Sequence, residues 1–420
     1  MRATKNSGFE WIGEIPTSWE LYKGKYMFTQ RNLRGNTIEL QLLSPTQKYG
    51  VVPQSVYEDR SGMNAVKLNE NANLSALKTI HKGDFCISLR SFQGGFEYSE
   101  YEGVVSPAYQ VFYPVVKVAR GYYKYLFKDS GFIEKMNSYT MTLRDGKNIA
   151  FADFGNTYIP CPPVDEQQRI ADFLDAKCAE IDALTADIQT QIDTLEQYKR
   201  SVITETVTKG LNPNAEMKDS EIEWVGQMPL AWDAVPNKYL MYKVKNICPV
   251  YNGEDILSLT TNGVIIRDLN GGGKMPTSFD GYQNVIPGNL LMCLFDIDVT
   301  PRCIGLVKNF GLTSPAYSQF VMRTGAYAPY YYYYYLMVDY TKELLHMAKN
   351  LRHSLTEDQL GAIKAPNPPY DEQVQIAEFL DKKCVEISRV IEDKNKQLAT
   401  LGEYKKSLIF EYVTGKKEIV

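Results

Sequence analysis

Residues 165–174 read DEQQRIADFL, and residues 371–380 read DEQVQIAEFL, so seven of ten positions repeat after 206 residues. Residues 11–19 (WIGEIPTSW) and 224–232 (WVGQMPLAW) form a second matched pair, and SPAY at 106–109 returns at 314–317. A repeat of about 210 residues is far longer than the units of solenoids and propellers, which run to roughly 20–50 residues. We therefore expect two copies of a whole domain, each with its connecting segment.

Each copy is expected to contain one long helix, which starts after Pro162-Pro163 or Pro368-Pro369 because proline does not fit inside a helix. Asp165 and Asp371 then place negative charge in the first turn, where the helix dipole favours it. Downstream, apolar residues recur with 4-3 spacing for about five heptads, which predicts coiled-coil packing. The seam positions are Leu174, Ile181, Ile188, Leu195, Leu380, Ile387, Ile391, Leu398 and Leu401.

The two helices, each roughly 60 Å long at about 1.5 Å per residue, are expected to pack on each other as an antiparallel coiled coil within the chain. The seam alone leaves open whether this pair is only a spacer or also docks a partner. Its outer faces, where a partner would bind, carry Asp172, Glu180, Asp182, Asp187 and Asp193.

The segments between the helices alternate short β-rich runs with Gly and Pro, which predicts mixed α/β domains with largely antiparallel sheets, an α+β fold. The expected division is a globular domain at 1–163, a helix at 164–209, a second globular domain at 210–369 with a linker at 210–223, and a helix at 370–420. The copies are expected to be related by an internal pseudo-two-fold repeat.

The composition is that of a globular chain, with 44% hydrophobic and 23% charged residues among 420. No stretch approaches the roughly 18–20 apolar residues of a membrane span, and the N-terminus lacks an apolar signal region, so we expect a cytoplasmic protein. Seven cysteines without a CxxC pair and only three histidines argue against a disulfide framework or a metal site. The net charge is −4, but the helical segments 165–208 and 371–420 carry −6 and −1, which leaves +3 elsewhere and permits a basic face.

Two motifs suggest chemistry and are set aside. Residues 367–370 read NPPY, a tetrapeptide with which amino-methyltransferases hold a flipped base. The first copy reads CPPV at 161–164 and lacks both chemical residues, so a helix-entry Pro-Pro pair is the preferred interpretation. Residues 271–274 (GGGK) lack the spacing of a phosphate-binding loop. No catalytic constellation is predicted.

Polar loops of the globular domains are the candidates for contact with nucleic acid. Arginine bridges two acceptors on guanine, asparagine and glutamine pair with adenine, and lysine meets phosphates. Solvated loop charges are the alternative at each position. The run Tyr330–Tyr335 has the same two interpretations, packing or contact with phosphates and bases. The candidate DNA-binding residues are Arg90, Ser91, Gln93, Arg144, Lys147, Asn148, Lys274, Lys349, Arg352 and His353.

The chain has two globular domains, and each is followed by a helix that starts with Pro-Pro-x-Asp-Glu-Gln. This arrangement resembles the specificity subunit of type I restriction-modification enzymes. The resemblance is carried by residues 162–174 and 368–380 and is supported by the two Trp-(Ile/Val)-Gly-x-x-Pro-x-x-Trp segments. It covers nearly the whole chain.

This resemblance implies that each globular domain is a target-recognition domain for one half of a split double-stranded DNA site. The helices would be the family's central conserved region and its C-terminal counterpart, which separate the readers and bind two methyltransferase subunits. S-adenosylmethionine, ATP and Mg would act on the methyltransferase and restriction/translocase subunits, and this chain would bind no cofactor and catalyse nothing. A stand-alone adenine methyltransferase and a non-DNA coiled-coil scaffold remain the alternatives.

Overall fold

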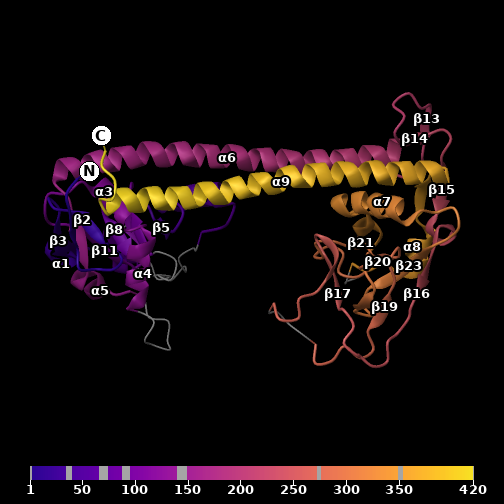
Figure 1. Ribbon diagram of the computed structural model, residues 1–420, viewed down its shortest axis with the longest axis horizontal. Coiled ribbons are helices and arrows are strands. Elements are labelled where there is room, and N and C mark those ends of the chain that lie inside the picture. Colours follow the sequence, from indigo (N-terminus) through magenta and orange to yellow (C-terminus); the bar gives the residue numbers. More distant parts are fainter. Residues whose placement is uncertain are drawn as a thin grey trace. The chain divides into compact units, whose positions relative to one another are not determined.

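The computed structural model describes residues 2–34, 40–65, 74–87, 95–139, 149–271, 276–348 and 353–419. The chain divides into two compact units: unit 1 comprises residues 1–188 and 396–420, and unit 2 comprises residues 189–395. Each unit contains one globular head with parts of both long helices packed on it (Figure 1). We call residues 2–163 head 1 and residues 217–369 head 2.

Head 1 is built around a four-stranded antiparallel sheet with the order β4 (Phe28–Gln30), β11 (Gln110–Pro114), β8 (Phe85–Ile87), β9 (Phe96–Tyr98). Four antiparallel strand pairs surround it: β1 (Thr4–Asn6) with β2 (Glu14–Pro16), β3 (Glu20–Lys23) with β12 (Tyr158–Cys161), β5 (Leu43–Thr46) with β6 (Gly50–Pro53), and β7 (Lys78–Ile80) with β10 (Gly103–Val105). The helices are α1 (Gly24–Met27), α2 (Gln54–Ser61), η1 (Leu74–Ala76), α3 (Arg120–Leu126), α4 (Ser130–Ser138) and α5 (Phe151–Asn156).

Head 2 repeats this plan with the sheet order β16 (Met241–Val244), β23 (Ser318–Met322), β20 (Leu290–Met292), β21 (Ile304–Leu306). Its strand pairs are β13 (Met217–Asp219) with β14 (Gln227–Pro229), β15 (Asp233–Pro236) with β24 (Lys364–Asn367), β17 (Leu257–Thr260) with β18 (Gly263–Ile266), and β19 (Gln283–Val285) with β22 (Gly311–Thr313). The helices are η3 (Asn237–Tyr239), α7 (Ala328–Thr341), η4 (Glu343–Met347) and α8 (Glu357–Ala362). The described strands of the two heads therefore match pair for pair, which confirms the predicted duplication of an α+β domain.

Aromatic side chains fill the cores of both heads. In head 1, Phe85 and Phe112 stack with ring centroids 5.4 Å apart, and Phe28 meets both rings edge-on. In head 2, the tyrosine run lies in α7, and five of its six side chains are buried: Tyr330, Tyr331, Tyr333, Tyr334 and Tyr335. A helix that is apolar all round lies inside a domain, so this run packs the core and does not form a surface for nucleic acid.

The long helices are α6 (Val164–Lys209) and α9 (Tyr370–Val413), and they run antiparallel where they pair. In unit 2, Lys394 on α9 hydrogen-bonds Gln191 on α6, and Lys199 further along α6 donates to Ser388, which lies earlier on α9. In unit 1, Lys405 forms a 2.6 Å ion pair with Asp182. The predicted antiparallel coiled coil is confirmed, and its seam positions are buried or half-buried in each unit.

A glycine in the left-handed region follows the end of each helix: Gly210, with φ 74°, comes directly after α6, and Gly415, with φ 74°, comes two residues after α9. Such a residue stops a helix because its N–H bonds back to the last turn, as Gly415 does to the carbonyl of Tyr412. The segment up to 420 was expected to be helical, but α9 stops at Val413, and Lys416 turns back to donate to the carbonyls of Ile12 and Glu14.

One buried tyrosine in each head hydrogen-bonds the end of the long helix that belongs to the other copy of the repeat. In head 1, the hydroxyl of Tyr122 donates to the carbonyl of Val413 at 2.6 Å, at the end of α9. In head 2, Tyr330 donates to the carbonyl of Val207 at 3.0 Å, near the end of α6. The last carbonyls of a helix lack intrahelical partners, so these tyrosines cap them. Each head thus holds the start of one long helix and the end of the other.

Candidate nucleic-acid interface

A buried glutamine fixes the start of each long helix to its head. Gln167 accepts from the backbone N–H of Ala119 at 2.9 Å and donates to the carbonyl of Pro162 at 2.8 Å. Gln373 makes the same contacts with Tyr327 and Pro368, both at 2.8 Å. This is the structural role of the repeated Asp-Glu-Gln motif, because a buried amide that is fully hydrogen-bonded holds one geometry.

A second pair of contacts joins the helices to α3 and α7. The hydroxyls of Tyr125 and Tyr333 donate to Asp175 and Asp381 at 2.6 and 2.7 Å. Burial, with help from the neighbouring carboxylates, raises the pKa of both tyrosines, so each keeps its proton and donates. The rigid frame of both heads is therefore the same, and differences between them are confined to other positions.

Of the ten candidate DNA-binding residues, only His353 lies among the described residues. It is half-exposed with φ 41°, and its Nε2 lies 3.9 Å from the carboxylate of Asp298. The remaining nine positions lie outside the described residues and stay predictions: Arg90, Ser91, Gln93, Arg144, Lys147, Asn148, Lys274, Lys349 and Arg352.

The described residues show how the candidate loops are anchored. Residues 88–94 lie between β8 and β9, which pair in the central sheet with Ile87 opposite Phe96. In head 2 the corresponding excursion between β20 and β21 is held by the buried Asp339, which accepts from the N–H of Cys303 at 2.9 Å and pairs with Lys342 at 2.8 Å. The sequences of the two heads differ at this place, where residues 88–94 read SLRSFQG and residues 293–303 read CLFDIDVTPRC.

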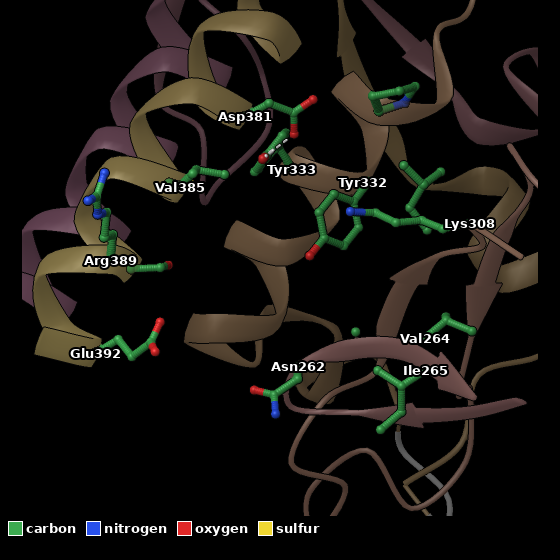
Figure 2. A pocket seen from close by; sticks show the side chains of 15 residues that line it. Asn262, Val264, Ile265, Lys308, Tyr332, Tyr333, Asp381, Val385, Arg389 and Glu392 are labelled. Atoms are coloured by element: carbon green, nitrogen blue, oxygen red, sulfur yellow. Dashed lines mark hydrogen bonds between the residues drawn. The ribbon is translucent and has the colours of Figure 1, made fainter. Parts of the chain in front are cut away.

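A groove of about 550 Å³ lies in unit 2 between the β17–β18 hairpin, α7 and α9 (Figure 2). Figure 2 shows Tyr332 on one side of the groove and Arg389 and Glu392, from α9, on the other; the dashed line marks the hydrogen bond from Tyr333 to Asp381. Lys308 also lines the groove. At the matching place in head 1, Lys124 lies between Glu100 at 3.7 Å and Asp175 at 3.1 Å, so the two heads use different charges there.

The NPPY segment serves the fold. The side-chain oxygen of Asn367 accepts from the hydroxyl of Tyr331 at 2.8 Å and from the amide of Gln373 at 3.2 Å. Because this acceptor is already occupied by the framework, the interpretation as a helix-entry segment is favoured over a base-holding one. Within the described ranges, no three His, Cys, Asp or Glu side chains gather as metal ligands. No described helix combines the length and the apolar character that a membrane crossing requires.

Two exposed tyrosines lie at matched positions of the long helices, one in each unit. Tyr198 on α6 and Tyr404 on α9 are 53% and 54% exposed. Beside Tyr198, Lys383 pairs with Glu386 at 3.0 Å, and beside Tyr404, Lys177 pairs with Glu180 at 2.8 Å. The glutamate raises the pKa of each lysine most, and the nearby tyrosine adds to the effect. We call Tyr198, Lys383 and Glu386 the helix patch of unit 2, and Tyr404, Lys177 and Glu180 the helix patch of unit 1.

Comparison with known proteins gives consistent matches. A family model described as the type I restriction modification DNA specificity domain matches residues 17–194. The specificity subunit of the type I restriction enzyme MjaVIII from Methanocaldococcus jannaschii is 26% identical over 303 residues, which cover 66% of this chain and 67% of that protein.

Solved structures match over nearly the whole chain. A chain from a study of complex assembly and conformational transition in the type I R-M system has a TM-score of 0.71 at 14% identity and covers 96% of this chain and 99% of that one. The HsdS subunit from Thermoanaerobacter tengcongensis has a TM-score of 0.51 at 15% identity, with coverages of 96% and 98%. At these identities the structural matches establish the fold. Residues 17–194 are thus similar to the type I restriction modification DNA specificity domain, and the chain shares the fold of the HsdS subunit over nearly its whole length.

Proposed function

We propose that this chain is the DNA-recognition subunit of a type I restriction-modification complex, in which each head reads one half of a split, asymmetric site. The observation that carries the proposal is a shared frame with divergent loops. The contacts of Gln167 and Gln373 are the same in both heads, whereas the sequences that follow β8 and β20 differ, with SLRSFQG at 88–94 and CLFDIDVTPRC at 293–303. Two readers built on one frame are suited to two different half-sites.

The chain is proposed to work in the cytoplasm without catalysing a reaction or binding a cofactor. Methylation of adenine with S-adenosylmethionine, and ATP- and Mg-dependent translocation and cleavage, would belong to methyltransferase and restriction/translocase subunits. Incubation of the purified chain with DNA and labelled S-adenosylmethionine tests this division. Methyl transfer by the chain alone would favour the stand-alone methyltransferase instead.

The helix patches are proposed as docking sites for two copies of the methyltransferase subunit. Exposed tyrosines are frequent anchors of protein interfaces, and two equivalent patches suit two copies of one partner. The substitutions Tyr198→Ala and Tyr404→Ala should each remove one copy of the partner from the purified complex. Val385→Ala, which truncates an exposed side chain on α9 whose matched position is Ala179, is the control and should leave the stoichiometry unchanged.

The experiment that tests the function directly is co-purification from cells followed by mapping of methylated adenines with and without the gene. The proposal expects one bipartite methylated sequence that disappears when the gene is deleted. Replacing residues 20–160 with the corresponding block of a relative should change one half of that sequence only. A change in both halves of the methylated sequence would contradict the idea that the two heads read independently. The same methylated sequences with and without the gene would refute the proposal.

A further inference from the structure

One exposed dipeptide is the same in both heads and lies outside the helix seam. Residues 24–27 read GKYM and residues 237–240 read NKYL. Met27 and Leu240 are buried, whereas Tyr26 and Tyr239 are 62% and 63% exposed. In each case the lysine ammonium lies over the ring of the next tyrosine, at 5.5 Å for Lys25 and 5.1 Å for Lys238.

A second cation and ring flank the dipeptide in each head. In head 1, Lys23 lies 5.4 Å from the ring centroid of Tyr158, and in head 2, Arg323 lies 5.1 Å from that of Tyr242. Both rings are partly exposed. Among the described residues, none of the four cations Lys23, Lys25, Lys238 and Arg323 has a carboxylate within ion-pair distance. Each head therefore presents two uncompensated positive charges beside exposed aromatic surface.

The position of this cluster relates it to the candidate reading loops. Helix α1, with Lys25, packs against α5, which follows the segment with Arg144, Lys147 and Asn148; the Lys25 ammonium donates to Asn156 at 3.3 Å. The element η3, with Lys238, packs against α8, which follows the segment with Arg352 and His353; Asn237 donates to the carbonyl of Leu360 at 3.0 Å. In both heads the dipeptide thus belongs to an element that packs against the helix following a candidate loop in the sequence.

Duplication allows backbone contacts and base contacts to be told apart. Contacts with bases must differ between two half-sites of different sequence, whereas contacts with sugar and phosphate carry no sequence information. Exposed residues that stay identical in both heads are therefore expected to contact the backbone. Lysine is suited to a phosphate, and a tyrosine hydroxyl donates to one as well.

We propose that Lys25-Tyr26 and Lys238-Tyr239 are a matched pair of backbone clamps, each of which binds the phosphates of the DNA duplex beside the half-site that its own head reads. The proposal rests on the proposed function of the chain as a DNA reader. It assigns these residues to affinity and positioning, and it leaves the choice of bases to the loops. Lys23 and Arg323 add positive charge to the same surfaces.

Binding of the full chain to a labelled duplex of random sequence, titrated with salt, tests the clamps. Each neutralised phosphate contributes about 0.9 to the slope of log affinity against log salt for B-DNA. Lys25→Gln and Lys238→Gln should each reduce the slope by about 1, and the double variant by about 2. Lys25→Arg should keep the wild-type slope. Selection from a random duplex pool should return the same preferred bases for all variants.

Lys48→Gln is the matched control, because Lys48 is an exposed cation 5.3 Å from the ring of Tyr49 but has no cationic counterpart in head 2, where the hairpin turn is Thr261-Asn262. Its slope should equal that of the wild type. If wild-type protein binds DNA and Lys25→Gln and Lys238→Gln leave the slope unchanged, or if either changes the preferred bases, the clamp is refuted. If the wild-type chain shows no salt-dependent binding to DNA, the proposed function itself fails.

Discussion

The tyrosines that cap the long helices allow a direct test of how each head is completed. The perturbations are Tyr122→Phe and Tyr330→Phe, which remove one hydroxyl each and keep the ring. The hydroxyls donate to the carbonyls of Val413 and Val207 at 2.6 and 3.0 Å, and all four residues are fully buried. Each substitution therefore leaves a buried carbonyl without a partner.

The expected cost is about 1–3 kcal/mol per substitution, the usual penalty for an unsatisfied buried polar group. For a unit of about 200 residues, roughly 2 kcal/mol lowers Tm by about 4–8 °C. Tyr122→Phe should destabilise unit 1 and increase hydrogen exchange in the last turn of α9. Tyr330→Phe should destabilise unit 2 and increase exchange in the last turn of α6.

Thermal unfolding combined with hydrogen exchange read by mass spectrometry measures both effects. Tyr198→Phe is the control, because that ring is half-exposed and its hydroxyl has no hydrogen bond among the described residues, so it should change neither quantity. The reasoning is refuted if Tyr122→Phe leaves exchange at the end of α9 unchanged, or if it loosens unit 2 as much as unit 1.

Three further predictions address other parts of the chain. Burial outweighs the ion pair with Lys128 and raises the pKa of Glu97 to about 7, so the folded state binds this proton more tightly than the unfolded state does. The free energy of unfolding of unit 1 should therefore fall by on the order of 3 kcal/mol as pH rises from about 4.5 to 7. Urea unfolding of Glu97→Gln should lack this pH dependence, and a variant with the wild-type pH profile would contradict the prediction. Gln167→Leu should cost about 2 kcal/mol or more through its lost buried hydrogen bonds, whereas the exposed neighbour Gln168→Leu should cost less than about 0.5 kcal/mol. Equal unfolding midpoints of the two variants in urea would contradict the stabilising role of the Gln167 hydrogen bonds. Seven residues inserted in each long helix keep the heptads in phase and add about 10 Å, so methylome mapping should show a half-site spacer longer by roughly three base pairs; an unchanged spacer would show that the helices do not set it.

The helices and the duplication were predictable because their signals are local and periodic. The Pro-Pro pairs and the 4-3 spacing determine where α6 starts and which face is buried, and neither depends on distant residues. The antiparallel packing followed from two such seams in one chain. The end of α9 was predicted too late because Gly415, a single residue in the left-handed region, stops the helix.

The contacts that join heads to helices were not predictable in the same way. Tyr122 and Tyr330 occupy matched positions of the repeat, but their partners Val413 and Val207 lie far away in sequence and contribute only carbonyl groups. Because every residue has a backbone carbonyl, the sequence does not indicate which carbonyl accepts such a hydrogen bond. The roles of Gln167 and Gln373 were missed for the same reason, although both belong to the most strongly repeated motif.

The discontinuity of unit 1 has a consequence for synthesis of the protein. Leu408 and Val413 belong to the core of head 1, so that core lacks part of its apolar surface while the ribosome is still making the second half of the chain. Unit 2 is continuous in sequence, from 189 to 395, and all its parts emerge earlier. The head that is translated first is therefore the last to be completed. Until residues 396–413 emerge, it exposes apolar surface to which chaperones can bind and through which the chain can aggregate. A premature stop shortly before Val413 would damage the reader encoded at the opposite end of the gene.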